Sequence, residues 1–121
     1  MTADAKTVEL GLDLPPAPPP MGVYKPIVIT GNLAYLSGHG PVQPDGTLMT
    51  GRVGDDLDLD AGYQSARQVG LTMLATPRAN PRSLARVQRV IHVPGTLNCT
   101  HDHPTHTNDT PTRPPFAAPG C

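Results

Sequence analysis

Two short apolar runs separated by Gly31-Asn32 constrain the fold of this 121-residue chain more than any other feature. Gly-Asn is a favoured two-residue hairpin loop, because both residues tolerate a positive φ. We therefore predict an antiparallel hairpin in which the strand before Gly31 is followed by a returning strand at residues 33–36. Pro26 stands at the start of the first strand, where the missing N–H is tolerated.

The second run leads into a polar corner with the sequence Ser-Gly-His-Gly-Pro at residues 37–41. A serine beside glycines presents its hydroxyl and backbone N–H groups together, which is a common way to hold a small polar or anionic ligand. A serine that closes a strand is more often a turn residue that bonds its own backbone, so both interpretations stay open. His39 has no acidic neighbour in the sequence to orient it, and we expect it to face solvent.

A helix is predicted after the hairpin, with Asp58 or Asp60 as its N-cap. Its apolar stripe consists of residues that recur at steps of three and four, namely Tyr63, Ala66, Gly70, Met73 and Leu74. Gly70 on this stripe indicates a close approach of the helix backbone to a sheet. Pro77 should end the helix near residues 75–76, because proline disfavours helical backbone in the residue before it.

Two further strands are predicted on either side of this helix. Asp45-Gly46 marks a turn before a short strand that contains Leu48. Residues 84–93 are rich in Val and Ile with few breakers, which favours a buried strand over a helix. The resulting order of elements is typical of an α/β (α+β) layered fold, in which a helix covers one face of a largely antiparallel sheet.

Composition and charge argue against several classes of protein. A net charge of −1 with one Phe, three Tyr and no Trp offers neither the basic field nor the stacking surfaces of a nucleic-acid-binding protein. The apolar runs are too short to cross a bilayer, and Asp4 and Glu9 stand where a secretory signal needs basic residues. We therefore expect a cytoplasmic protein with no nucleic-acid or membrane partner. Its two cysteines, Cys99 and Cys121, are too few for a disulfide framework.

The composition divides the chain into three parts. Residues 1–22 form a Pro-rich N-terminal arm, which we expect to lie over the body as a stiff polyproline II segment. Residues 23–93 form the folded domain. Residues 94–121 form a tail in which Thr, Pro and His dominate and apolar periodicity disappears, so we expect disorder there.

The tail gathers several metal-ligand residue types, namely Cys99, His101, Asp102, His103 and His106. Their spacing does not provide the paired ligands on two distinct elements that a structural zinc site uses, and we expect no metal. A catalytic Cys99–His101 dyad is also disfavoured, because nothing defines a rigid third group or an oxyanion hole.

Several motifs follow one another in a specific order. They are Gly-x-Tyr-Lys-Pro at 22–26, Leu-Ser-Gly-His-Gly-Pro at 36–41, Asp-Gly at 45–46, Gly-Arg-Val-Gly at 51–54, Asp-Ala-Gly-Tyr-Gln-Ser-Ala-Arg at 60–67 and Arg-Val-Gln-Arg-Val-Ile at 86–91. On these motifs, residues 10–100 resemble the Rid family of enamine/imine deaminases, also called YjgF-like and often labelled "endoribonuclease L-PSP". The resemblance implies a chorismate-mutase-like β-sheet with a covering helix, homotrimers with clefts between subunits, and no metal or organic cofactor.

The resemblance also implies a substrate-binding site. Tyr24 matches the family tyrosine that lines the cleft, Ser37 matches the serine that contacts substrate from the strand end, and Gly38 contributes its backbone. The implied substrate is a 2-imino or enamine acid, which is hydrolysed to a 2-keto acid and ammonia. Without the resemblance, Tyr24 would be interpreted as an edge aromatic residue and Ser37 as a turn cap.

The chain departs from the family in its C-terminal part, where it resembles a truncated member that lacks the last helix and strands. The family's late-strand arginine, which holds the substrate carboxylate, has no secure match, and Arg113 is the only late arginine. The carboxylate near the family's C-terminus has no secure match either. We therefore identify no catalytic residue and expect little or no deaminase activity. A non-catalytic ligand-binding or regulatory homologue and a non-functional fragment remain alternatives.

Overall fold

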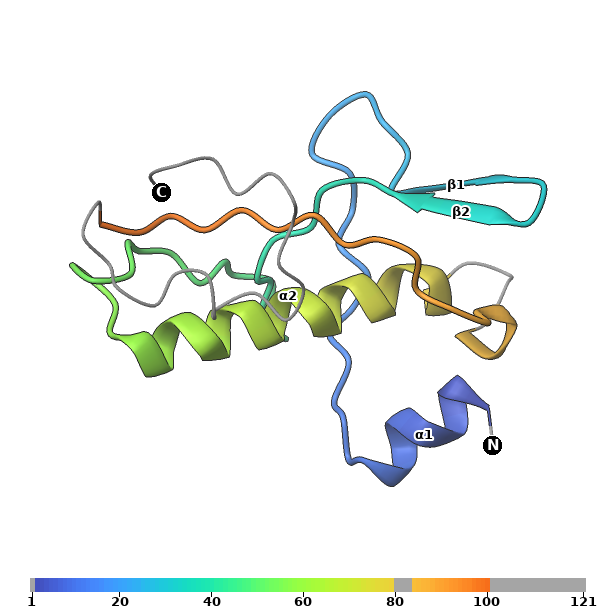
Figure 1. Cartoon of the computed structure of the whole chain (residues 1–121), viewed down its shortest axis with the longest axis horizontal. Coiled ribbons are helices and arrows are strands. Elements are labelled where there is room, and N and C mark those ends of the chain that lie inside the picture. The colour runs from blue at the N-terminus through green and yellow to red at the C-terminus, as the bar shows by residue number, and fades with distance from the viewer. Residues whose placement is uncertain (1, 80–83, 101–121) are drawn as a thin grey trace.

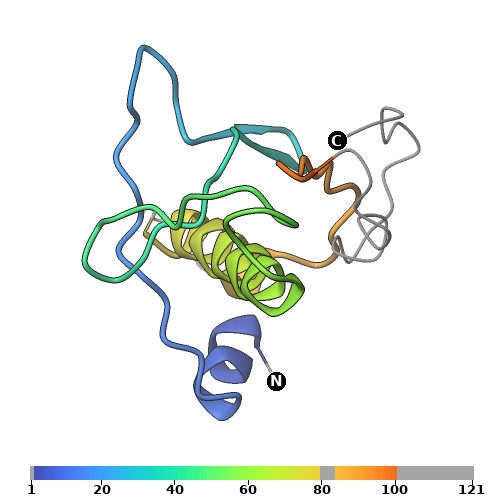
Figure 2. The ribbon, with the colours of Figure 1, turned by 90° about the vertical axis from the view of Figure 1, so that its left-hand side faces the viewer.

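The computed structural model describes residues 2–79 and 84–100 of the chain. Its elements are α1 (Ala3–Glu9), β1 (Ile27–Thr30), β2 (Leu33–Leu36), α2 (Leu59–Ala79) and the 3-10 helix η1 (Leu84–Arg86). The long helix α2 lies between the hairpin and α1 (Figures 1 and 2). The fold is a small α+β arrangement with an antiparallel two-stranded sheet and a helix beside it, which confirms the predicted class.

The hairpin has the predicted strands and loop. Ile27 pairs with Leu36 at one end of the antiparallel ladder, and Gly31-Asn32 forms the two-residue loop at the other end. Gly31 has a φ of 57°, in the left-handed region that favours glycine. In the described part of the chain, no third strand extends this sheet. Most strand side chains are exposed as a result.

Helix α2 begins at the predicted cap but ends later than predicted. The Asp58 carboxylate accepts a hydrogen bond from the Ala61 N–H at 2.8 Å, so Asp58 is the cap. The prediction that Pro77 ends the helix is wrong, because α2 continues through it to Ala79. Proline removes one backbone hydrogen bond inside a helix. Here Pro77 is buried together with Ala75, and this packing offsets the lost bond.

The buried face of α2 differs from the predicted stripe. Its buried residues are Gly62, Leu71, Thr72, Ala75, Thr76 and Pro77. Tyr63 is 41% exposed, and a Cβ added to Gly70 would have no atom within 4 Å. The close approach occurs instead at Gly62, where an added Cβ would stand 3.1 Å from Cγ2 of Val53. The start of α2 therefore packs on the loop that contains Val53.

The predicted strand at residues 84–93 is wrong. The segment starts as the 3-10 helix η1 and continues without regular structure. Val87, Val90 and Ile91 are 46%, 68% and 69% exposed, so within residues 2–79 and 84–100 no layer covers the apolar residues that favoured a buried strand. Leu84 alone in this segment is buried, and the neighbouring Ala85 N–H donates to the Asp4 carboxylate at 2.9 Å.

The predicted turn at Asp45-Gly46 is present, but the strand after it is reduced to a single bridge. Gly46 has a φ of 87°, and the Asp45 carboxylate accepts hydrogen bonds from the Thr47 N–H at 2.9 Å and the Thr47 hydroxyl at 2.6 Å. Beyond the turn, Leu48 forms an isolated antiparallel bridge to Val42.

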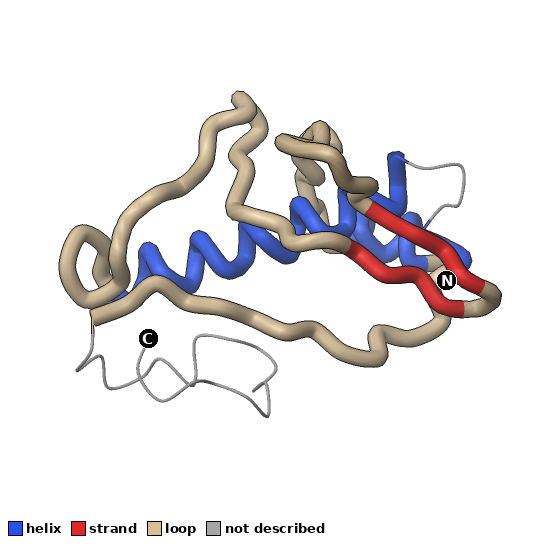
Figure 3. The backbone as a smooth tube through the Cα atoms, turned by 90° about the horizontal axis from the view of Figure 1, so that it is seen from above, coloured by secondary structure: helices blue, strands red, loops and turns tan. Residues whose placement is uncertain are grey.

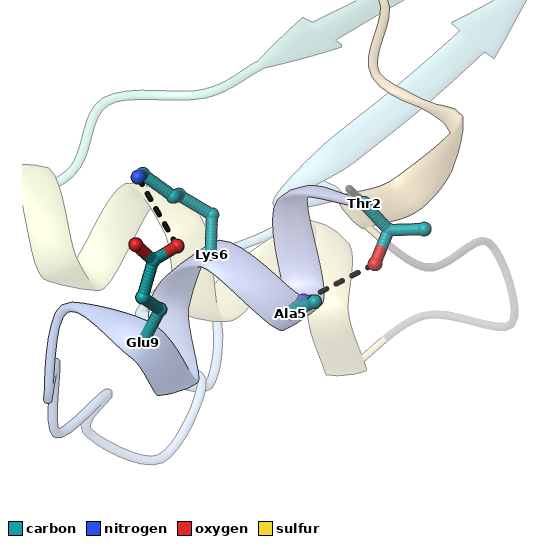
Figure 4. A network of polar contacts seen from close by, with 4 residues as sticks. All are labelled: Thr2, Ala5, Lys6 and Glu9. Atoms are coloured by element: carbon teal, nitrogen blue, oxygen red, sulfur yellow. Dashed lines mark hydrogen bonds and ion pairs between the residues drawn. The ribbon is translucent and has the colours of Figure 1, made fainter.

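The N-terminal arm contains the helix α1, which was not predicted. The Thr2 hydroxyl accepts a hydrogen bond from the Ala5 N–H at 3.1 Å, and Lys6 forms an ion pair with Glu9 at 3.1 Å (Figure 4). A threonine cap before an acidic first turn was the sequence signal for this helix.

The Pro-rich part of the arm lies against the end of α2. Pro15 is buried. Together with Thr7 and Leu12 it lines an open hollow that is also lined by Ala75 and Arg78 of α2. The arm thus contacts the body through its proline segment.

The first residues of the predicted tail, 94–100, are described, and part of this segment contacts the loop before α2. The Val53 N–H donates to the Asn98 carbonyl at 3.0 Å, and the Thr100 N–H donates to the Val53 carbonyl at 2.9 Å. Between them Cys99 is 1% exposed. This extended segment returns past the hairpin to the loop before α2 (Figures 1 and 3). The rest of the predicted tail, residues 101–121, lies outside the described residues.

Candidate functional site

Ser37 stands where the hairpin ladder ends. Its N–H donates to the Pro26 carbonyl at 3.0 Å, which adds one hydrogen bond beyond the last strand pair. Its hydroxyl donates to the same carbonyl at 3.4 Å, at the long end of the range for such a bond. Because this second bond is long, the hydroxyl can turn to a ligand at little cost.

Gly38 forms an open ledge next to Ser37. It is exposed, and a Cβ added there would have no atom within 4 Å. The backbone N–H groups of Gly38 and His39 have no hydrogen-bond partner in residues 2–79 and 84–100. Adjacent unpaired N–H groups beside open space can receive a carboxylate or another small anion.

The structure corrects the prediction for His39, which is half-buried rather than turned to solvent. Its Nδ1 lies 2.7 Å from the Ser37 carbonyl oxygen. Its Nε2 lies 2.7 Å from the hydroxyl oxygen of Thr76, a residue of α2 that is 1% exposed. Sequence analysis missed Thr76. The available signal was a pair of threonines, Thr72 and Thr76, spaced by four on one face of the helix.

A second contact anchors the segment that follows the corner. Nε2 of Gln68 in α2 donates to the Val42 carbonyl at 2.6 Å. Gln68 and Thr76 are eight positions apart in α2, which corresponds to about 12 Å along a helix. The corner and the residues after it are thus attached to α2 at two separated points.

Tyr24 is not part of the same hydrogen-bonded cluster. Its side chain is 46% exposed, and its hydroxyl accepts a hydrogen bond from the Met21 N–H at 3.2 Å. No hydrogen bond joins Tyr24 to Ser37 in the described residues. The structure therefore brings together Ser37, Gly38 and His39, and leaves Tyr24 in the exposed loop before β1.

The other residues considered from the sequence lie largely outside the described structure. Arg113, His101, Asp102, His103 and His106 all belong to that part of the chain. Cys99 is described, and its carbonyl accepts a hydrogen bond from Nε of Arg52 at 3.1 Å. The metal-ligand residue types of the tail and the late arginine are therefore not tested by the structure.

Comparison with solved structures places the fold beside known ones. The chain is similar to the crystal structure of a candidate endoribonuclease from Shewanella oneidensis MR-1, with a TM-score of 0.83 and 27% identity over 90% of this chain and 72% of that one. It is also similar, with a TM-score of 0.50 and 34% identity over 62% of this chain and 43% of the other, to a protein of unknown function from Agrobacterium tumefaciens. No protein-family model and no curated protein matches the chain.

The Shewanella structure is of the L-PSP type, the label that the sequence resemblance carried. The similarity supports the predicted fold at the level of this structural type. In the described part of the chain, no helix has the length and apolar character that a membrane crossing requires.

Proposed function

We propose that the chain binds small 2-keto and 2-imino carboxylates at the corner formed by Ser37 and Gly38. The observation that supports this proposal best is the exposed Gly38 ledge, where two backbone N–H groups without a partner in the described residues stand beside the Ser37 hydroxyl. Hydrogen bonds from N–H and O–H groups to a carboxylate are charge-assisted, and each is stronger than a bond between neutral groups. Tyr24 belongs to the proposed binding residues on the resemblance.

The reaction that fits this ligand class is hydrolysis of an imine. The oxygen of water adds to the imine carbon, one proton of the water passes to the nitrogen, and the C=N bond becomes a single bond. The remaining hydroxyl proton then passes to the nitrogen, the C–N bond breaks, ammonia leaves, and the C=O bond of a 2-keto acid forms. An enamine enters the same route after a proton adds to its carbon. Such chemistry depends on orientation of substrate and water more than on a strong nucleophile. The resemblance implies that its substrates are intermediates released by pyridoxal-phosphate enzymes.

We expect binding without efficient turnover in this chain, because a bidentate arginine on the carboxylate contributes much of the orientation in such a site. The test measures pyruvate binding by calorimetry and ammonia release from an enamine-generating system. We expect millimolar binding that Ser37→Ala abolishes, and ammonia release close to the uncatalysed rate.

Two results would change this proposal. Rapid ammonia release that Arg113→Ala abolishes would show that the late arginine completes a catalytic site. Pyruvate binding that is absent from the intact chain, or unaffected by Ser37→Ala, would contradict a ligand site at the corner. Tyr24→Phe tests the tyrosine separately, because it removes the hydroxyl and keeps the ring.

RNA cleavage is a second candidate, suggested by the name of the Shewanella protein. The charge of −1 and the scarcity of aromatic residues weigh against it, since phosphate contacts provide most of the affinity for nucleic acids. Incubation with a mixed-sequence RNA at low salt distinguishes the two candidates. We expect no cleavage above that of a Ser37→Ala control.

We further propose that the chain assembles as a homotrimer. The exposed strand side chains of the hairpin, including Val28 at 46% and Tyr35 at 60%, leave apolar surface that assembly could cover. Equilibrium sedimentation tests this. A mass three times that of the 12.7 kDa chain is expected, and a stable monomer would count against the proposal.

A further inference from the structure

His39 lies between two parts of the molecule that are far apart in the sequence. Nδ1 contacts the carbonyl of Ser37, two residues away, and Nε2 contacts the hydroxyl of Thr76, 37 residues away. A carbonyl oxygen only accepts hydrogen bonds, so Nδ1 carries a proton and donates it to Ser37. In the neutral ring, Nε2 is then the acceptor for the Thr76 hydroxyl. Both ring nitrogens are engaged, which leaves neither free for acid–base chemistry on a ligand.

The Ser37 carbonyl and the Gly38 N–H belong to the same peptide unit. That unit is planar and trans, so the N–H points away from the carbonyl. When His39 holds the carbonyl, the Gly38 N–H therefore points in the opposite direction within the peptide plane, away from His39. Glycine tolerates both orientations of the preceding peptide, so Gly38 alone does not fix this direction.

We propose that His39 and Thr76 are positioning residues, which hold the Ser37 peptide so that the Gly38 N–H is presented to the carboxylate of a ligand. The proposal rests on the proposed function, since it assigns a role within the same site. It gives α2 a part in ligand binding through Thr76, a buried hydroxyl that no sequence motif marked. We call the His39–Thr76 contact the latch.

The experiment uses the intact chain and three threonine variants. Thr76→Val removes the latch hydroxyl and keeps the side-chain shape, whereas Thr76→Ser keeps the hydroxyl. Thr72→Val is the matched control, because Thr72 is also fully buried on α2 but donates to the Gln68 carbonyl at 2.9 Å instead of contacting His39. The measurements are the imidazole nitrogen chemical shifts of His39, pyruvate affinity and the urea midpoint of unfolding.

In the intact chain we expect Nδ1 of His39 to carry a proton, because it faces a carbonyl oxygen. Thr76→Val should weaken pyruvate binding about tenfold, which corresponds to the loss of roughly one hydrogen bond. Thr76→Ser should restore the affinity. Thr72→Val should lower the urea midpoint by a similar amount to Thr76→Val but leave the pyruvate affinity unchanged. If the role of Thr76 were purely structural, the two variants would have the same pyruvate affinity.

Two results would overturn the latch. One is a neutral His39 ring that carries its proton on Nε2 in the intact chain. This measurement does not depend on the folding of any variant. The other is equal pyruvate affinity in Thr76→Val and Thr72→Val. Absence of pyruvate binding in the intact chain would contradict the proposed function instead, and the imidazole nitrogen shifts of His39 would still decide whether the latch exists.

Discussion

The hairpin and the C-terminal half of α2 are held in different ways. In the hairpin, the strand residues pair through the backbone, yet Ile29, Leu33 and Tyr35 are 37%, 42% and 60% exposed. In α2, Leu71 and Thr76 are 6% and 1% exposed. Backbone hydrogen bonds and the turn define the hairpin, whereas side-chain packing defines this part of the helix. The proposed ligand corner joins the two, because Ser37 extends the hairpin ladder and His39 attaches the corner to α2.

The largest effect expected from this comparison is on stability. Leu71→Ala should lower the free energy of unfolding by about 2–5 kcal/mol, because it removes a buried side chain and leaves a cavity. Leu33→Ala, the matched change in the hairpin, should lower it by only about 0.5 kcal/mol. Urea denaturation with an unchanged slope, at a protein concentration low enough to keep the chain monomeric, measures both. Equal losses under these conditions would break the comparison.

Two glycines in α2 provide a smaller test. Gly70→Ala should raise the free energy of unfolding by about 1 kcal/mol, because alanine has the higher helix propensity and the new Cβ meets nothing. Gly62→Ala should raise it less or lower it, since its Cβ would stand 3.1 Å from Val53. Thermal denaturation of the two variants gives their order. The reverse order would show that α2 packs through Gly70, as the sequence pattern indicated.

The smallest effect concerns the turn at Asp45. Hydrogen bonds from the Thr47 side chain and then from its backbone N–H hold the pKa of the Asp45 carboxyl below its ordinary value of 3.8. Folding thus favours the charged form. The contribution of the turn is complete at neutral pH and is lost as the pH falls below about 4 through the lowered folded-state pKa. A carbon-detected NMR titration should show this lowered pKa, and Thr47→Val should raise it. An ordinary pKa in the intact chain would contradict the turn geometry.

Sequence patterns predicted the elements whose causes are local. The hairpin follows from Gly31-Asn32 and the start of α2 from Asp58, because each signal acts within a few residues. The strand at residues 84–93 failed for a different reason. Its apolar residues indicate burial, but burial depends on a sheet edge and a covering layer that the local sequence does not specify.

The position of the corner was predicted, whereas its role as a binding site stays a prediction. Ser37 follows the end of the second strand, as the motif indicated. The role of His39 did not follow, because its partner Thr76 is 37 residues away and becomes visible only when α2 is placed. The same packing keeps α2 helical through Pro77, against the local preference of proline.

The most direct test of the account is an amide NMR titration of the intact chain with pyruvate, repeated on Ser37→Ala. We expect saturable shifts at the amides of Gly38 and His39, a smaller shift at Thr76 transmitted through the latch, and none in α1. Ser37→Ala should abolish them. Shifts confined to the hollow between the arm and α2, or shifts at Gly38 that survive Ser37→Ala unchanged, would contradict a ligand site at this corner.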